Sequence, residues 1–229
     1  MTLKGLFNTR WPAAALFDLD GTLVDSALDL AAAVDQTLEK LGRPPAGIDR
    51  VHQWVGHGAA ILMRRALAGK ADWQPASAAD EALFEDAMAL FFQHYEIANG
   101  KHSKVYPGVM ECLNRLQQMD CPMAIVTNKP EQFVAPLLKQ LKLDGYFQLI
   151  VGGDTLANKK PHPEPLLYAM GKLNGRPGTT VMVGDSTADV QAAKAAGIPC
   201  VAVTYGYNFG NPVQALGANT VVDSLSELL

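Results

Sequence analysis

Two acidic clusters in the sequence each follow a short apolar segment that resembles a buried strand. Asp18 and Asp20 stand in "ALFDLDGTLVDS", and Asp185 and Asp189 stand in "VMVGDSTADVQAAKAAG". Like charges about 4 Å apart repel by about 4 kcal/mol at an effective dielectric constant near 20, so such a cluster needs a cation, protons or a lysine. Mg²⁺ suits a few carboxylates, retained water and a substrate phosphate. The two clusters therefore indicate a magnesium site if the fold brings them together.

Two further polar segments could bind a phosphoryl group. Thr127 and Asn128 in "IVTNKP" follow an apolar run and precede an expected helix, so they offer a hydroxyl, an amide and backbone N–H groups to an anion. Lys159 and Lys160 in "NKKPHPEP" lie in a segment that three prolines keep extended. Each segment alone is common as a helix cap or a solvated surface. Together, in this order after apolar runs, they favour phosphate chemistry.

The elements that would position these residues alternate along the second half of the chain. The expected strands are 13–17, 121–127, 148–154, 180–185, 200–205 and 219–223, and the expected helices are about 108–119, 130–142, 164–174 and 187–196. Strands that alternate with helices in this way are typical of a parallel sheet covered by helices. In such sheets ligands bind at the carboxyl ends of the strands, where the acidic residues are expected to lie.

Residues 26 to about 100 have a different pattern, because they carry helical periodicity and no strand candidate. A block of this length between the first strand and the rest of the sheet is far longer than an ordinary connection. We therefore expect a small helical domain, with "GKHSKVYPG" (100–108) as the hinge that returns the chain to the sheet.

Composition excludes several classes of protein. The 229 residues are 48% hydrophobic, and 19 Lys and Arg face 23 Asp and Glu, so neither a basic nucleic-acid surface nor a membrane span of ~20 apolar residues is expected. The three cysteines form no C-x-x-C pair, and the N-terminal segment has no signal-peptide core. We expect a cytoplasmic protein, a monomer or homodimer, with neither nucleic acid nor membrane as a partner.

Four motifs resemble those of the haloacid dehalogenase superfamily: "DLDGT" (18–22), "VTN" (126–128), "KKP" (159–161) and "GDSTAD" (184–189). All four occur in the order typical of that superfamily. The resemblance implies an α/β fold, with a Rossmann-like doubly wound parallel sheet as core and an inserted small α-helical cap domain. The expected boundaries are 1–25 plus 103–229 for the core and 26–102 for the cap.

The resemblance also implies a role for each motif residue. Asp18 would be the nucleophile that forms an aspartyl-phosphate, and Asp20 would be the general acid and base. The metal ligands would be the carboxylates of Asp18 and Asp185 and the backbone carbonyl of Asp20, with Asp189 orienting them. Thr127, the amide N–H of Asn128 and Lys160 would neutralise charge on the transferred group.

The implied activity is Mg²⁺-dependent hydrolysis of a small phosphate monoester, with 2-phosphoglycolate as the expected substrate. Asp20 favours ester hydrolysis over dehalogenation, since a halide leaves without a proton. The cap loop "VGHGAA", with Gly56, His57 and Gly58, is either a substrate contact or a simple turn between helices. Alternatives are a sugar-phosphate phosphatase, including one for cell-wall sugars, and a phosphosugar mutase. A phospho-accepting signalling module is a non-enzyme alternative, which the chain length and the helical insert disfavour.

Overall fold

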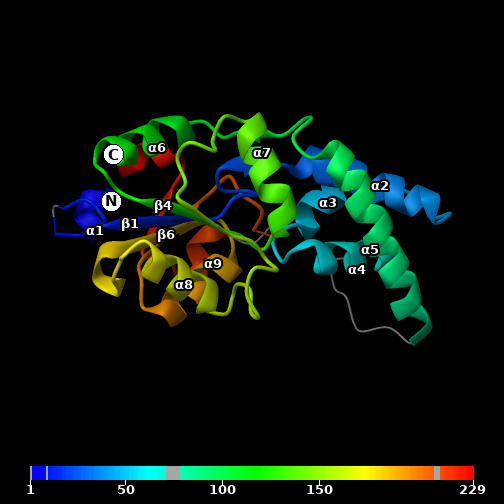
Figure 1. The fold of residues 1–229 in the computed structure, drawn as a ribbon. Helices are drawn as coiled ribbons and strands as arrows, with labels where there is room; N and C mark the ends of the chain where they lie inside the picture. Colours follow the sequence, from blue (N-terminus) through cyan, green and yellow to red (C-terminus); the bar gives the residue numbers. More distant parts are fainter. Residues whose placement is uncertain (1, 9, 71–77, 209–211) are drawn as a thin grey trace.

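The computed structural model describes residues 2–8, 10–70, 78–208 and 212–229. Figure 1 shows two parts side by side, a core built on a twisted sheet and a group of helices that includes α2 to α5. No helix in the described ranges is long and apolar enough to span a membrane.

The elements follow the expected alternation. The strands are β1 (Ala14–Phe17), β2 (Val24–Asp25), β3 (Lys104–Val105), β4 (Met123–Val126), β5 (Leu149–Val151), β6 (Thr180–Gly184), β7 (Cys200–Val203) and β8 (Thr220–Val222). The α-helices are α1 (Leu3–Leu6), α2 (Ala27–Lys40), α3 (Ile48–Trp54), α4 (Ala59–Ala68), α5 (Ala78–Ala98), α6 (Val109–Gln118), α7 (Val134–Gln140), α8 (Glu164–Lys172) and α9 (Thr187–Ala196). The short 3₁₀ helices are η1 (Glu131–Phe133), η2 (Pro177–Thr179), η3 (Val213–Leu216) and η4 (Leu225–Leu228).

Six parallel strands form the main sheet in the order β5-β4-β1-β6-β7-β8. The first strand therefore lies between β4 and β6, and the chain builds the sheet outward from β1 in both directions. In open α/β sheets a ligand crevice forms where the strand order reverses in this way. The expected α/β fold with a doubly wound parallel sheet is confirmed.

Both faces of the sheet are covered, as the apolar strand sequences predict. Ala15 and Phe17 of β1 face the core cluster that includes residues of α6 and α7, whereas Ala14 and Leu16 face the cluster that includes residues of α8 and α9. Figure 1 shows α6 and α7 on one side of the sheet and α8 and α9 on the other. This covering leaves the strand ends as the place where polar side chains can meet.

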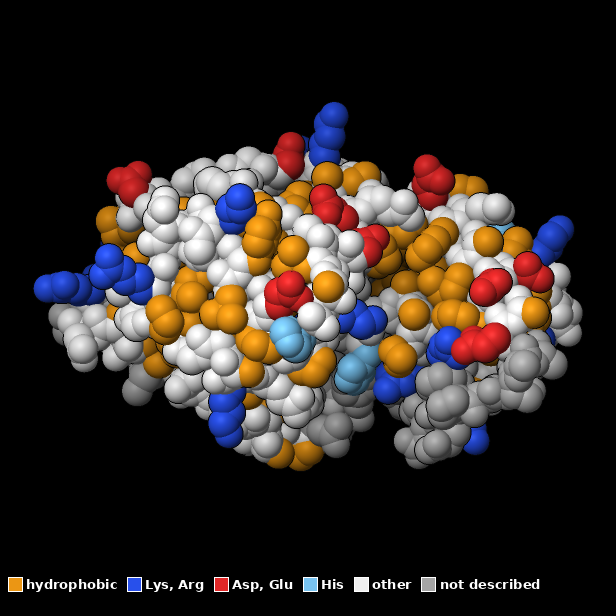
Figure 2. All heavy atoms as spheres, turned by 60° about the horizontal axis from the view of Figure 1, so that its bottom comes forward, with side chains coloured by type: hydrophobic (Ala, Val, Ile, Leu, Met, Phe, Trp, Pro, Cys, Tyr) orange, Lys and Arg blue, Asp and Glu red, His pale blue; other side chains and the backbone are white. Residues whose placement is uncertain are grey.

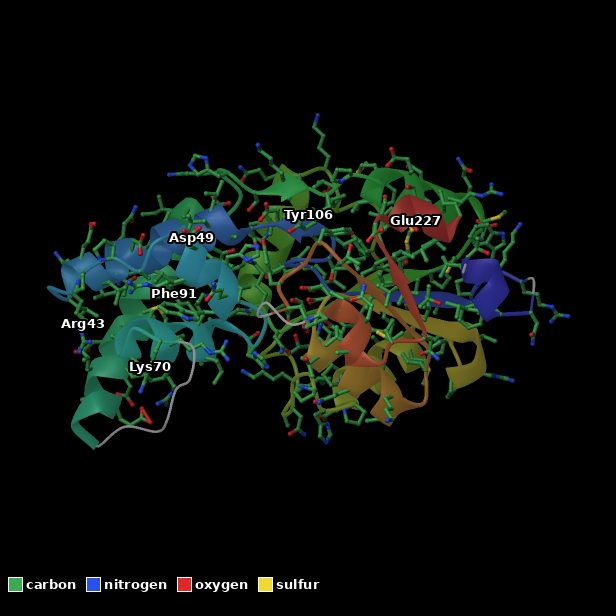
Figure 3. The ribbon with its side chains drawn as sticks, turned by 180° about the vertical axis from the view of Figure 1, so that it is seen from behind. Arg43, Asp49, Lys70, Phe91, Tyr106 and Glu227 are labelled. Atoms are coloured by element: carbon green, nitrogen blue, oxygen red, sulfur yellow. The ribbon has the colours of Figure 1, made fainter. Side chains whose placement is uncertain are left out.

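The helices α2 to α5, here called the helical insert, have a core of their own that includes Leu38, Trp54, Met63 and Phe91. Figure 3 labels Phe91 among these helices. Two core residues, Phe133 and Tyr207, belong to the same cluster, so apolar side chains of the insert pack directly on the core. The cap limits 26–102 stay a prediction, and residues 71–77 of that range lie outside the described residues.

An antiparallel ribbon that the sequence did not predict joins the two parts. Val24 pairs with Val105 and Asp25 pairs with Lys104, so the chain enters and leaves the insert through two adjacent strands of two residues each. Runs this short carry no alternation that sequence analysis could detect. Asp29 of α2 also holds the segment that returns to the core. Its buried carboxylate accepts hydrogen bonds from the backbone N–H groups of Gly100, His102 and Ser103.

Candidate active site

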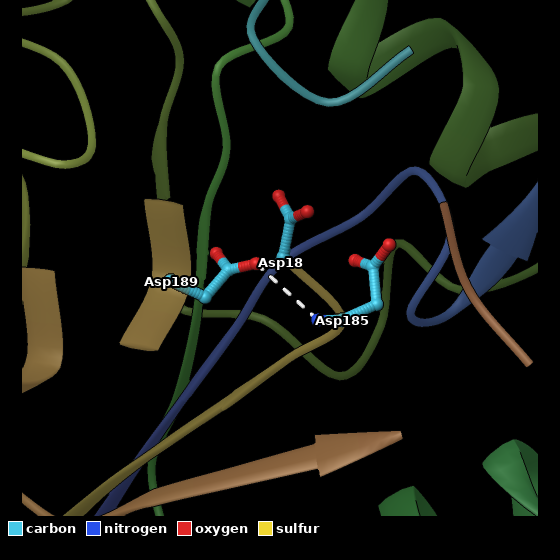
Figure 4. Close-up of side chains that lie close together, drawn as sticks. All are labelled: Asp18, Asp185 and Asp189. Atoms are coloured by element: carbon cyan, nitrogen blue, oxygen red, sulfur yellow. Dashed lines mark hydrogen bonds between the residues drawn. The ribbon is translucent and has the colours of Figure 1, made fainter. Parts of the chain in front are cut away.

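Three adjacent strands direct the motif residues to one edge of the sheet. Asp18 follows β1, Thr127 follows β4, and Asp185 follows β6. The carboxylates of Asp18, Asp185 and Asp189 are buried and each offers an oxygen within 4.8 Å of the other two. Figure 4 shows the three side chains close together, with Asp18 from the loop after β1 and Asp185 and Asp189 from the junction of β6 and α9. The structure thus brings together the two acidic clusters of the sequence.

Glycine at position 21 lets the first acidic loop approach Asp185. Its φ is +90°, and a Cβ placed on it would lie 2.5 Å from Asp185 Oδ2, closer than any real contact. The next residue, Thr22, donates from its hydroxyl to Asp185 Oδ1 at 2.8 Å. The backbone N–H of Tyr207 donates to Asp185 Oδ2 at 2.6 Å. Asp185 is therefore fixed in orientation from two sides.

The carboxylate of Asp189 accepts hydrogen bonds from the loop between β6 and α9. Its Oδ2 accepts from the backbone N–H groups of Asp185 and Ser186 at 3.2 and 3.0 Å and from the Ser186 hydroxyl at 2.7 Å. The bond to the Ser186 N–H is the reach-back of a capping box at the start of α9. Its Oδ1 accepts from Lys160 Nζ at 2.6 Å. These bonds leave Asp18 and Asp185 with more free acceptor capacity than Asp189.

Lys160 is a buried cation between two of the carboxylates. Its Nζ lies 2.9 Å from Asp18 Oδ1 and 2.6 Å from Asp189 Oδ1. Burial alone would lower the pKa of Lys160, but the two carboxylates outweigh it and raise the pKa. The ammonium is thus held charged beside the acid that would attack phosphorus.

The carboxylates fit a magnesium ion. Burial raises the pKa of Asp18 to about 6, although Lys160 opposes that rise. Burial, with the negative charges of Asp18 and Asp189, also raises the pKa of Asp185 well above its usual range. Two buried acids so destabilised as anions would be stabilised by a divalent cation, and their all-oxygen donor set is of the kind that Mg²⁺ prefers.

Asp20 contacts a second buried lysine, which the sequence analysis did not assign a role. Lys129 Nζ lies 3.1 and 3.3 Å from the two carboxylate oxygens of Asp20 and also donates to the hydroxyl of Tyr95. The Ser26 hydroxyl donates to Asp20 Oδ1 at 2.5 Å. Burial would lower the pKa of Lys129, but Asp20 and Tyr95 raise it. The one sequence signal for Lys129 as a site residue is its position directly after the motif "VTN".

A cavity of about 40 Å³ lies between the core and the helical insert. Its wall comprises Asp18, Asp20, Leu30, Val55, Gly56, Gly58, Ala59, Leu62, Phe91, Tyr95, Thr127, Asn128, Lys129, Pro130 and Phe133. Figure 2 shows hydrophobic side chains gathered on the face where the two parts meet, with basic and histidine side chains beside them. A space this small fits a few waters or a compact ligand.

The loop of Gly56, His57 and Gly58 contacts the core through its backbone carbonyls. Lys159 Nζ donates to the carbonyl of His57 at 3.3 Å, and Asn128 Nδ2 donates to the carbonyls of Gly56 at 3.5 Å and of Lys160 at 3.0 Å. Of the three predicted loop residues, Gly56 and Gly58 line the cavity, whereas the wall does not include His57. Burial, together with neighbouring basic groups, lowers the pKa of His57.

A family model described as haloacid dehalogenase-like hydrolase matches residues 15–203. The chain belongs to this family. The chain is 51% identical over 224 residues to a phosphoglycolate phosphatase of Pseudomonas putida, covering 98% of this chain and 81% of the relative. It is 50% identical over 223 residues to phosphoglycolate phosphatase 1 of Pseudomonas aeruginosa, with 97% and 80% coverage.

Solved structures of this family share the architecture. The crystal structure of a predicted phosphoglycolate phosphatase from Haemophilus somnus superposes with a TM-score of 0.85 at 34% identity, over 94% of this chain and 96% of that one. The sequence resemblance to the haloacid dehalogenase superfamily is therefore confirmed along nearly the whole chain.

Proposed function

We propose that this haloacid dehalogenase-like hydrolase is a magnesium-dependent phosphatase that hydrolyses 2-phosphoglycolate to glycolate and phosphate. The observation that carries the proposal is the meeting of Asp18, Asp185 and Lys160 at one edge of the sheet, where Asp18 also lines a small cavity. The names of the close Pseudomonas relatives support the choice of substrate.

Magnesium would be held by the carboxylates of Asp18 and Asp185 and by the backbone carbonyl of Asp20, with Asp189 orienting the loop. When bound, the ion would neutralise charge on the phosphoryl oxygens and keep both buried acids ionised. Asp189 supports this assignment because its own oxygens are occupied by Lys160 and by Ser186.

The first chemical step is attack of an Asp18 carboxylate oxygen on phosphorus. A bond forms between that oxygen and phosphorus, the bond from phosphorus to the ester oxygen breaks, and the departing glycolate oxygen takes a proton from Asp20. Lys160, Thr127 and the backbone N–H of Asn128 stabilise the charge on the transferred group, because catalysis of phosphoryl transfer depends mainly on positioning and electrostatics.

The second step is hydrolysis of the aspartyl-phosphate. Water attacks phosphorus, Asp20 takes back a proton from that water, and the bond between phosphorus and Asp18 breaks to release phosphate. Closure by the helical insert supports both steps, since it keeps bulk water from the intermediate. We take residues 26–102 as this closing cap and residues 1–25 with 103–229 as the catalytic core.

The choice of 2-phosphoglycolate over a sugar phosphate rests on the names of the close relatives and on the apolar part of the cavity wall. In that part of the wall, Leu62, Phe91 and Phe133 offer no hydrogen-bonding side chain to a polyhydroxylated ring. This is the reason for placing 2-phosphoglycolate ahead of the sugar-phosphate and mutase alternatives.

A panel of phosphate esters, assayed with Mg²⁺ and with excess chelator, tests the proposal. We expect the highest kcat/KM for 2-phosphoglycolate, loss of activity in chelator, and no activity of Asp18→Asn. An exposed-site variant, Asp144→Asn, is the control for expression and folding. Hydrolysis that does not need a divalent metal, or a clear preference for sugar phosphates, would contradict it.

A further inference from the structure

Among the described residues that line the cavity, Lys129 is the basic one and Asp18 and Asp20 are the acidic ones. The Lys129 side chain is 3% exposed. The proposed phosphoryl chemistry uses Lys160, which pairs with Asp18, and gives Lys129 no part. A lysine buried this deeply needs partners, which Asp20 and Tyr95 supply, and its place in the cavity wall also brings it within reach of a ligand.

The position of Lys129 relative to Asp20 places it beside the leaving group. Asp20 must lie next to the ester oxygen if it is to give that oxygen a proton, and Lys129 Nζ lies 3.1 Å from Asp20 Oδ1. In 2-phosphoglycolate the carbon attached to the ester oxygen carries the carboxylate. The ammonium therefore stands on the side of the cavity where that carboxylate would lie.

We propose that Lys129 binds the carboxylate of the substrate and thereby selects carboxylate-bearing phosphate esters. This inference rests on the proposed function, because it assigns the second anionic group of the same substrate. An ammonium has three N–H donors, which here serve the Asp20 carboxylate and the Tyr95 hydroxyl. The substrate carboxylate either accepts a hydrogen bond from the ammonium alongside Asp20 or replaces Asp20 as its partner.

Tyr95 makes the carboxylate site depend on the helical insert. It comes from α5, its hydroxyl accepts from Lys129, and its ring centroid lies 4.6 Å from the ammonium. Phe91 and Phe133 pack on Tyr95, with ring centroids 5.5 and 5.0 Å away. These aromatic rings exclude water from the ammonium, which strengthens its attraction for an anion.

Binding of two non-hydrolysable phosphonates tests the inference. 3-Phosphonopropionate carries the carboxylate and propylphosphonate lacks it, and both are titrated calorimetrically in the presence of Mg²⁺. We expect wild-type protein to prefer 3-phosphonopropionate by about 100-fold, since a desolvated charge pair is worth that much in affinity. Lys129→Met should reduce the preference to less than about 10-fold, and Lys129→Arg should keep part of it.

Lys139→Met, which removes an exposed lysine on α7, is the matched control and should keep the wild-type preference. Thermal melts establish that each variant is folded. Equal binding of the two phosphonates by wild-type protein would overturn the inference even if Lys129→Met does not fold. An unchanged preference in folded Lys129→Met, or an equal loss for both ligands, would overturn it too.

The same titrations separate this inference from the proposed function, because they need no turnover. If the preference depends on Lys129 while wild-type protein leaves 2-phosphoglycolate intact, the proposed function fails and the carboxylate site stands. If 2-phosphoglycolate is hydrolysed and the preference does not depend on Lys129, the carboxylate site fails and the proposed function stands.

Discussion

Asp20 is held at the cavity wall by a cation and a hydroxyl, Lys129 and Ser26, and its side chain is 13% exposed. These contacts fix the direction of the carboxylate while leaving it in reach of a ligand. Proton transfer depends on geometry first, so a fixed and accessible carboxylate suits the general-acid role proposed for Asp20.

Replacing Asp20 by Asn should slow hydrolysis of alkyl phosphates by about 10²- to 10⁴-fold, the usual contribution of general acid catalysis. The loss on p-nitrophenyl phosphate should be less than about 10-fold, because p-nitrophenolate leaves with little need of a proton. The measurement is kcat/KM for both substrates, with Asp144→Asn as control. Equal losses on the two substrates would remove the general-acid assignment.

Asp185 lies in a cluster whose like charges cost stability until a cation binds. We expect Mg²⁺ at about 100 times its Kd to stabilise wild-type protein by about 2.7 kcal/mol. For a chain of this length that corresponds to a rise in Tm of roughly 5–10 °C. The measurement is a thermal melt with and without Mg²⁺.

Asp185→Asn should have a Tm in chelator equal to or above that of wild-type protein, because burial and its acidic neighbours raise the pKa of Asp185. The same variant should lose the Tm shift with Mg²⁺, since it lacks one of the proposed ligands. A Mg²⁺ shift of wild-type size in Asp185→Asn would place the ion elsewhere.

At the scale of elements, the return from the helical insert is fixed by one side chain of α2. Asp29 accepts hydrogen bonds from the backbone N–H groups of Gly100, His102 and Ser103 at 2.9, 2.8 and 3.0 Å and from the Ser103 hydroxyl at 2.5 Å. Its side chain is fully buried. The return segment is thus attached to the insert itself, next to the ribbon of β2 and β3.

Asp29→Asn should lower the free energy of unfolding by about 2–3 kcal/mol, because hydrogen bonds to a buried carboxylate are lost. Hydrogen exchange of the amides of Gly100, His102 and Ser103 should speed up at the same time. Asp49→Asn at the exposed start of α3 is the matched control. A loss of less than about 0.5 kcal/mol with unchanged exchange would show that the ribbon alone fixes the hinge.

The loop before α4 meets the core so closely that Gly58 has no room for a side chain. Its φ is +88°, and a Cβ would lie 2.9 Å from the carbonyl oxygen of Asn128. Gly69, at the end of the same helix, has a φ of +69° and open space around it. Both glycines have a positive φ, but Gly58 has a ψ of +167°, a region essentially restricted to glycine, whereas Gly69 is left-handed with a ψ of +17°. They also differ in the contact with the core.

Gly69→Ala should destabilise the protein by about 1–2 kcal/mol, the cost of a left-handed residue with a Cβ. Gly58→Ala should cost about 1–3 kcal/mol, because its backbone lies in a region that is essentially restricted to glycine. Gly58→Ala alone should also lower kcat/KM by at least about 10-fold, because the loop can no longer close on Asn128. Unfolding in urea and steady-state kinetics measure the two effects. Similar activity in both variants would show that the loop contact is not needed for catalysis.

At the scale of the whole molecule, the sequence predicted the helices and strands better than the order in which the strands pair. The apolar runs predict each strand of the main sheet within a few residues, because a buried parallel strand is a local pattern. The order β5-β4-β1-β6-β7-β8 is not local, and it is this order that brings the ends of β1, β4 and β6 together.

The same limit explains which site residues the sequence missed. Asp18 and Asp185 stand in motifs whose residue types and spacing indicate their chemistry. Lys129 contacts its partners only once the chain has folded. Asp20 is 109 positions away from Lys129 in the chain, and Tyr95 is 34 positions away. No periodicity or motif encodes such contacts between the core and an inserted group of helices.

The central claim is that three strands assemble one site in which Asp18 attacks phosphorus. Acid quenching during turnover with 2-phosphoglycolate and Mg²⁺, followed by borohydride reduction and peptide mass spectrometry, tests it most directly. We expect a phosphoryl adduct, reduced to homoserine, at Asp18 and no adduct in chelator or in Asp18→Asn. An adduct at another residue, or full turnover by Asp18→Asn, would contradict the claim.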